Sequence, residues 1–319
     1  MTKARNLSLL SAVEAGATTD QTKADLNAIG VSGGRKNLII NGGMTISQRG
    51  DFTASAAAAN GSFYVDRFKA VLSAVAGDKQ HTTVTIGGVT KRAFKITATS
   101  AATGTVQIKQ GVELSGIEVG ETYTISCWMK SNHADARLRN NNIGGTSSDS
   151  PTSHTGGGAW EKITWTVDST STTANILIYA TIYDGANVAI AVGDYIEITD
   201  FQMEKGSVAT DFEHLTYAEN LIACQRYYYK YDHSGLSDAV YLTSPYSAAS
   251  HDGSLPNSSQ SGAYWLPVPM RANPTCTATL SAGSASRVTS NGRVVVVQQS
   301  SSTANQAIYA TIVTADAEL

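Results

Sequence analysis

Apolar and polar residues alternate along most of the chain from position 36 to position 213. In the segment 122–129, every second residue is apolar, beginning at Tyr123 and ending at Met129. The same pattern recurs in three further runs, at 94–98, 163–167 and 176–182. An alternation of period two is typical of β-strands that bury one face. With glycine-rich turns between them, about nine to eleven such strands predict an all-β sandwich.

The alternation of apolar and polar residues is interrupted in one predicted strand. Its apolar set begins as Ile196 and Ile198 and continues as Phe201 and Met203. The parity therefore slips by one residue at Thr199 and the residue after it. Because a slip of one position would turn every following side chain to the other face, we expect a β-bulge there.

The pattern changes after residue 213. Residues 217–226 predict one or two helical turns, and a second, smaller β domain is expected beyond them, with short strands near 239–243, 263–270, 275–280, 293–299 and 306–314. Between its first two strands lies a Ser-rich segment, 244–262. A connection of that length is typical of a binding loop or of a segment without fixed structure.

Residues 1–35 differ from the rest of the chain. They predict a short helix with Leu26 and Ile29 on one face, followed by a Gly-rich link at 31–35. A single helix cannot bury its apolar stripe alone, so it must dock on something else. We therefore expect a docking segment at 1–35, a β-sandwich at 36–213 and a β domain at 214–319.

Composition and charge narrow the partners. Charged residues make up only 15% of the 319 positions, and the net charge is −3. No broad positive field is therefore available to bind nucleic acid. The three cysteines form no CxxC pair and do not resemble a disulfide framework. The amino terminus has no apolar run long enough for a signal peptide or a membrane span, so we expect synthesis in a cytosol and no membrane insertion.

Three stretches of the chain are similar to segments of a known family. Residues 37–44, which read NLIINGGM, with QRG at 48–50, resemble the strand that opens the jelly-roll module of bacteriophage tail fibre proteins. Residues 200–213 and the CQRYY run at 224–228 resemble the segment that closes that module and enters the tip domain. The LPVPMRANPT run at 266–275 is similar to a strand and turn of the same tip domains.

The resemblance covers roughly residues 36–280. It implies an antiparallel jelly-roll sandwich related to carbohydrate-binding modules, followed by a smaller C-terminal β-sandwich. It also implies a homotrimer that assembles in the host cytoplasm and is located in the virion tail, where residues 1–35 anchor it to another tail protein. Such proteins attach to a cell-surface receptor, often a glycan. Met203 departs from the family pattern, which often has another apolar residue there.

No catalytic constellation is visible, and we expect a protein that is not an enzyme. Glycoside hydrolysis needs two carboxylates at a set separation, one of them with a raised pKa. The available acids fall at turns or on outward strand positions: Glu113, Glu121, Asp184, Asp194, Glu197 and Asp200. The chain also lacks a GxSxG elbow, an HExxH pair and a phosphate loop.

Asp200 is the acid with an implied role. In carbohydrate-binding jelly rolls an Asp at the start of the closing strand often helps to hold a structural calcium ion, which prefers oxygen ligands. The resemblance transfers that role to Asp200, with the Asn41 region as a candidate source of further ligands. The alternative is a carboxylate that accepts backbone N–H groups at the predicted bulge.

Aromatic side chains are the candidates for sugar binding, since their flat faces match the C–H faces of pyranoses. Trp128 lies on the strand parity opposite to Tyr123 and Met129. Tyr246, Tyr264 and Trp265 border the long Ser-rich segment. The alternative is that Trp265 is a core residue and that the tyrosines lie in an interface.

A run of large aromatics follows the predicted helix and alternates poorly. The side chains of such a run point to more than one face, and each face must be covered. Tyr is enriched in subunit interfaces, which can provide such a cover. We therefore predict a homotrimer interface at Tyr227, Tyr228, Tyr229 and Tyr231.

Three functions remain open. The first is a receptor-binding tail fibre protein, whose partner is a host glycan or surface protein. The second is a purely structural tail, neck or capsid decoration subunit. The third is a polysaccharide depolymerase, although the short repeats of a long parallel β-helix are not visible. For the first function, we expect the receptor contact in the C-terminal domain at 244–262 and the adjoining aromatics, because the anchored amino terminus places that domain nearest the cell.

Overall fold

The computed structural model describes residues 35–113, 117–170, 176–232, 259–280, 285, 287–300 and 310–318. The predicted anchor helix with Leu26 and Ile29 lies outside the described residues. So do Tyr246, the predicted strand at 239–243 and most of the Ser-rich segment. Within the described residues no helix is long and apolar enough to cross a membrane.

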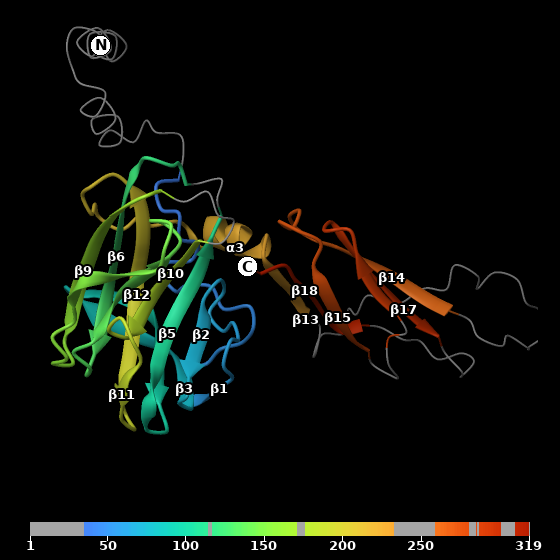
Figure 1. Cartoon of the computed structure of the whole chain (residues 1–319). Helices are drawn as coiled ribbons and strands as arrows, with labels where there is room; N and C mark the ends of the chain where they lie inside the picture. The colour runs from blue at the N-terminus through green and yellow to red at the C-terminus, as the bar shows by residue number, and fades with distance from the viewer. Residues whose placement is uncertain are drawn as a thin grey trace, which may run out of the picture. The chain divides into compact units, whose positions relative to one another are not determined.

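Two antiparallel sheets form the first part of the molecule (Figure 1). Among the described residues, the first sheet has six strands in the order β1-β3-β4-β12-β6-β9. Their bounds are β1 Ala56–Ala58, β3 Gly77–Ile86, β4 Val89–Ala98, β12 Tyr195–Lys205, β6 Thr122–Ser131 and β9 Trp160–Asp168.

In the described part of the chain, the second sheet follows the order β11-β5-β10-β7-β8, and β2 pairs with β5 beside this path. Its strands are β2 Lys69–Ser73, β5 Ala102–Val112, β7 Ala136–Asn141, β8 Ser148–Ser153, β10 Ile176–Ile182 and β11 Val188–Ile190. The twelve strands found here exceed the expected nine to eleven by one. The predicted antiparallel jelly-roll sandwich is confirmed.

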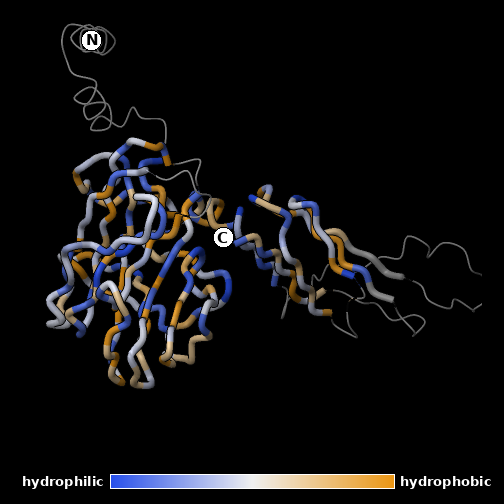
Figure 2. Tube along the Cα trace, in the orientation of Figure 1, coloured by the Kyte–Doolittle hydropathy of each residue, from blue (hydrophilic) through white to orange (hydrophobic). Residues whose placement is uncertain are grey.

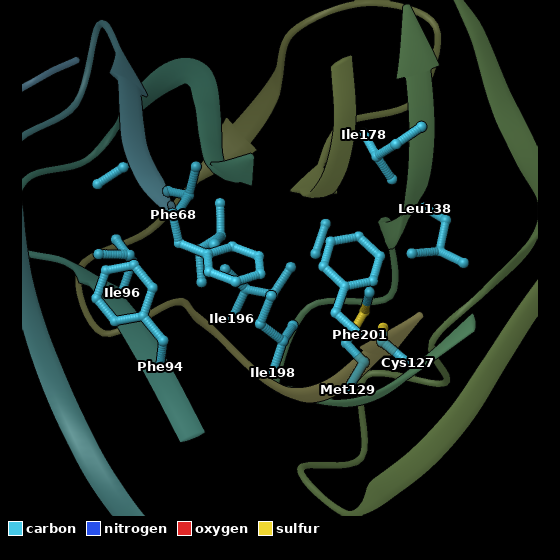
Figure 3. Packing of buried hydrophobic residues seen from close by; sticks show 14 of the residues in the cluster. Phe68, Phe94, Ile96, Cys127, Met129, Leu138, Ile178, Ile196, Ile198 and Phe201 are labelled. Carbon is cyan, nitrogen blue, oxygen red and sulfur yellow. The ribbon is translucent and has the colours of Figure 1, made fainter. Parts of the chain in front are cut away.

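The inward side chains of the two sheets form one apolar core. The rings of Phe68 and Phe201 stack with their centroids 6.1 Å apart, and Figure 3 shows Cys127 and Met129 beside Phe201. Alternating apolar and polar positions can be followed along the strands in Figure 2. Burial raises the pKa of the Cys127 thiol, so this cysteine behaves as a small apolar residue, as the sequence indicated.

A helix and a second sandwich follow. Helix α3, Tyr217–Gln225, begins with a capping box in which Thr216 and Glu219 each bond the other's backbone N–H. Two sheets that have three strands each among the described residues come next, in the orders β13-β18-β15 and β14-β17-β16. Their bounds are β13 Tyr228–Asp232, β14 Ser259–Trp265, β15 Thr275–Leu280, β16 Arg287–Ser290, β17 Val294–Ser300 and β18 Ala310–Asp316.

The second sandwich has its own apolar cluster, which joins Val295 and Val297 of one sheet to Leu280 and Val313 of the other. The predicted smaller C-terminal β-sandwich is confirmed. One detail was wrong: Ser259–Trp265 is a strand, so positions 259–262 belong to β14 and not to the predicted loop. Strand β16 was not anticipated.

Candidate glycan-binding site

A β-bulge in β12 organises the site. The pairing of β12 with β6 shifts register between Thr199 and Gln202, and Asp200 takes a positive φ of 50°. This conformation is less costly for Asp than for most residues. The extra residue lets Phe201 point into the core after Ile198, so the predicted bulge is confirmed. Asp200 lines a pocket at this point.

Asp200 is held by an ion pair. Lys91, on β4, donates from Nζ to Oδ2 of Asp200, and both side chains are largely buried, with 16% and 6% of their surfaces exposed. The carboxylate thus has a side-chain cation as its partner, which neither sequence interpretation anticipated. Within the described residues, no group of three or more His, Cys, Asp or Glu side chains is placed to hold a metal. The calcium role implied for Asp200 therefore stays a prediction.

Asn41 also has another role. Its Oδ1 accepts from the backbone N–H groups of Thr45 and Ile46, at 3.0 Å each. Its Nδ2 donates to the backbone oxygens of Ile46 and Asp66, at 2.9 Å each. Nδ2 of Asn220, on α3, donates to the same Oδ1 at 3.1 Å. Asn41 therefore fixes the turn that precedes the first strand and joins it to the helix.

Trp128 lies half-buried beside the bulge, with Thr199 of β12 opposite on one side and Lys162 of β9 on the other. Its neighbours Cys127 and Met129 point into the core, so Trp128 faces outward. The predicted parity of Trp128 is confirmed. A pocket of about 380 Å³ opens on this outer face, lined by Lys91, Ser126, Trp128, Lys162, Asp200, Thr210, Asp211, Phe212 and His214.

One wall of the pocket is the segment that follows β12, residues 206–216, here called the strap. Two outward side chains of β12 hold it. Glu204 accepts from the backbone N–H of Thr210 at 2.8 Å and from its hydroxyl at 2.6 Å. Gln202 accepts from the N–H of Glu213 at 2.9 Å and donates to Glu204 at 2.8 Å. Gln202 and Glu204 are buried, so the strap is bonded to the sheet through satisfied polar groups.

Phe212 connects the strap to the start of the sandwich. Its ring meets His214 edge to face, with centroids 5.0 Å apart, and lies against Gly42. A Cβ at Gly42 would stand 3.2 Å from the Phe212 ring and 1.9 Å from the backbone oxygen of Phe201. The backbone N–H of Phe201 also donates to the oxygen of Gly42 at 2.9 Å. Only glycine allows this close approach of the two segments.

The pocket combines an aromatic face with polar groups of both kinds. Trp128 and Phe212 supply apolar surface, and the Lys162 ammonium and the Ser126 hydroxyl can donate hydrogen bonds. Asp211 can accept them. A volume of about 380 Å³ lies within the usual range for small-molecule sites, which pair apolar walls with a few directional polar groups. This arrangement suits a neutral sugar ring.

The aromatics of the C-terminal sandwich are placed differently. Tyr264 is 5% exposed and its ring packs on Tyr231, with centroids 5.4 Å apart. A glycan cannot reach it, which corrects the expectation for Tyr264. Trp265 is 76% exposed, so its assignment to the core was wrong. The two differ because successive residues of β14 point to opposite faces.

The tyrosine run mostly packs within the chain. Tyr227 has no exposed surface, and the guanidinium carbon of Arg67 lies 3.5 Å from its ring centroid. The guanidinium carbon of Arg49 lies 3.6 Å from the ring centroid of Tyr228. Tyr227 therefore has no surface left for a partner subunit, because a cation from the first sandwich covers it. Tyr229 and Tyr231 are half-buried, and the trimer interface stays a prediction for them.

Several pocket residues escaped the sequence interpretation. The outward positions of Lys162 and Ser126 follow from strand alternation, but nothing in the sequence joined them to Lys91. Phe212 and His214 lie in an irregular segment, whose path depends on the Gln202 and Glu204 hydrogen bonds. Only the resemblance of residues 200–213 had drawn attention to that segment.

No protein-family model and no curated protein matches the chain. Among solved structures, TmCBM61 in complex with β-1,4-galactotriose is 17% identical, with a TM-score of 0.30, over 54% of this chain and all of that one. The CBM22-1 xylan-binding domain of Paenibacillus barcinonensis Xyn10C is 16% identical, with a TM-score of 0.31, over 50% of this chain and 97% of that one. The enzymatically active domain of bacteriophage CBA120 tailspike protein 4 is 11% identical, with a TM-score of 0.32, over 53% of this chain and 21% of that one. These structure neighbours are similar in fold to half of the chain.

Proposed function

We propose that the protein binds a glycan in the Trp128 pocket, and that it does so as the receptor-binding subunit of a bacteriophage tail fibre. The observation that carries the proposal is the pocket itself. An outward tryptophan lies there beside donors and acceptors held in place by the bulge, the Lys91–Asp200 ion pair and the strap. Preorganised aromatic and polar groups of this kind are what a sugar ring requires.

The sequence resemblance supports the tail fibre part of the proposal. The stretches at 37–44 and 200–213 each resemble a tail fibre segment, and they meet at one place in the fold. Gly42 touches Phe201 and Phe212, and Leu38 donates its backbone N–H to the oxygen of Met203 at 2.8 Å. Location in the virion tail, anchoring by residues 1–35 to another tail protein and assembly as a homotrimer belong to the same proposal. Light scattering should then give three times 33.5 kDa, and a concentration-independent monomer would contradict the trimer.

The two alternatives make different demands on the pocket. A depolymerase needs a protonated carboxylic acid facing a second carboxylate. Asp200 does not suit the acid role, since its Oδ2 already accepts a hydrogen bond from the Lys91 ammonium. A purely structural subunit needs no open pocket. We therefore favour binding over both alternatives.

The test compares two outward tryptophans of the same chain. Trp128→Ala should reduce binding to the oligosaccharides that the native protein retains on a glycan array by about tenfold or more, because an aromatic platform contributes roughly 1–3 kcal/mol. Trp265→Ala removes an equally large side chain from the second sandwich and is the matched control.

Unchanged binding by Trp128→Ala, together with loss in Trp265→Ala, would reject the pocket. It would support the receptor contact expected in the C-terminal domain at 244–262. Thermal unfolding of both variants shows whether either change acts through the fold.

A further inference from the structure

A row of cationic and aromatic side chains crosses the outer face of the second sheet, on the opposite side of the sandwich from the Trp128 pocket. Pairing places Lys69 of β2 opposite Lys109 of β5, Lys109 opposite Tyr179 of β10, and Tyr179 opposite Arg139 of β7. Their strand neighbours Ala70, Ile108, Ile178 and Leu138 are core residues, so the row points outward. Adjacent strands lie about 4.8 Å apart, so the row spans about 14 Å.

Lys69 and Lys109 form an unfavourable pair. Like charges directly opposite each other destabilise a sheet, and in the described part of the chain neither ammonium has a carboxylate within ion-pair distance. Their Nζ atoms lie over rings instead, with Lys109 5.5 Å from the centroid of Tyr179 and Lys69 5.3 Å from that of Phe63. Burial, and then the charge of Lys69, lower the pKa of Lys109. An anion between the two ammonium groups would reduce both the repulsion between them and the cost of burying the Lys109 charge.

The other cations of this face are already neutralised. Arg139 donates to Asp149 at 2.8 Å, and Arg137 lies 2.7 Å from a carboxylate oxygen of Asp184. The unbalanced positive charge is therefore confined to Lys69 and Lys109. That separates this pair from a general basic surface.

A hydroxyl on the next row is also unsatisfied. Thr181 is two residues from Tyr179 on β10 and points to the same face, between Gln107 and Arg137 on the neighbouring strands. Its Oγ1 and the Nε of Arg137 are buried and have no hydrogen-bond partner in the described structure. Buried polar groups are normally paired.

We propose that this face is a second glycan-binding surface, and that it takes an acidic polysaccharide whose sugar carboxylate sits between Lys69 and Lys109. It extends the proposed glycan binding but rests on a different face and different contacts. A polysaccharide fits better than a nucleic acid, because two unpaired cations on a protein of net charge −3 cannot neutralise a run of phosphates. One carboxylate needs only this pair.

Binding of an oligogalacturonate to the full-length protein tests the proposal, with a neutral galacto-oligosaccharide of equal length as the reference probe. We expect the acidic probe to bind and the double variant Lys69→Gln/Lys109→Gln to lose at least about tenfold in affinity, as for loss of a charge-assisted hydrogen bond. Lys162→Gln, in the other pocket, is the matched control and should keep the acidic probe.

Two outcomes would overturn the proposal. One is equal affinity of native and double-variant protein for the acidic probe, including the absence of binding by both. The other is tighter binding of single-stranded DNA that is lost in the same variant, which would make the row a phosphate site. Trp128→Ala should leave the acidic probe bound, so failure here and failure of the Trp128 pocket can be told apart.

Discussion

The two outer faces of the large sandwich differ in whether their polar side chains have partners. On the first sheet, Asp200, Gln202 and Glu204 are buried and each has a partner, and the resulting network fixes the walls of the Trp128 pocket. On the second sheet, Lys69 and Lys109 face each other without a counterion in the described structure, and the Thr181 hydroxyl is unpaired. The first face is built to hold its shape without a ligand, whereas the second is under electrostatic strain that a ligand can relieve.

Gly42→Ala gives the largest expected effect, because it pushes the opening segment away from the bulge and the strap. The new Cβ would stand 1.9 Å from the Phe201 oxygen, which is backbone and cannot rotate away. We expect a loss of about 3 kcal/mol in the free energy of unfolding, measured by urea denaturation.

The adjacent glycine provides the control. A Cβ at Gly43 would meet its nearest atom at 3.5 Å, in ordinary contact with Phe212. Gly43→Ala should therefore change stability by less than about 1 kcal/mol. Equal losses in the two variants would show that the close approach at Gly42 does not hold this face together.

The sequence predicted the bulge on this face but not the strap that covers it. The parity slip at Thr199 predicted the bulge, since the apolar residues on both sides of it must reach one core. The strap could not be predicted, because it has no periodicity and its path is set by hydrogen bonds from Gln202 and Glu204. For the same reason, Trp128 and Asp200 were the only pocket residues that the sequence singled out as site candidates.

The sequence also could not predict which residues face each other across neighbouring strands. Lys69 and Lys109 are forty positions apart, and only the register of β2 with β5 places them opposite each other. The run of tyrosines predicted an interface, because sequence alone cannot reveal a cation such as Arg67 above Tyr227. Tyr264 and Trp265 are neighbouring aromatics, so apolarity alone could not decide which of them points inward.

Lys91→Met gives the next largest effect on the first face. It leaves the Asp200 carboxylate largely buried without its cation, and we expect a loss of about 2 kcal/mol in unfolding free energy. Lys162→Met, at the same pocket but exposed, should cost less than about 0.5 kcal/mol. The double variant Lys91→Met/Asp200→Asn should recover part of the loss. A loss no larger than that of Lys162→Met would mean that the ion pair does not shape the pocket.

Lys109→Gln gives the smallest effect and should have the opposite sign. Since the pKa of Lys109 is lowered from 10.5 in the folded protein, the unfolded chain binds this proton more tightly. Its charge therefore costs stability below the folded pKa, and that cost disappears as the pH rises past 10.5. At pH 7 and low salt the variant should be more stable than the native protein by about 0.5 kcal/mol. Thermal unfolding at two salt concentrations measures this, and a clear destabilisation would contradict the strain assigned to the second face.

The central claim is that a glycan binds at Trp128, and fluorine NMR of protein labelled with 5-fluorotryptophan tests it most directly. The chain has four tryptophans, and substitution of each in turn assigns its signal. Addition of the neutral oligosaccharide that binds best on the array should shift the Trp128 signal and leave that of Trp265 in place. A shift of Trp265 with Trp128 unmoved would contradict the claim.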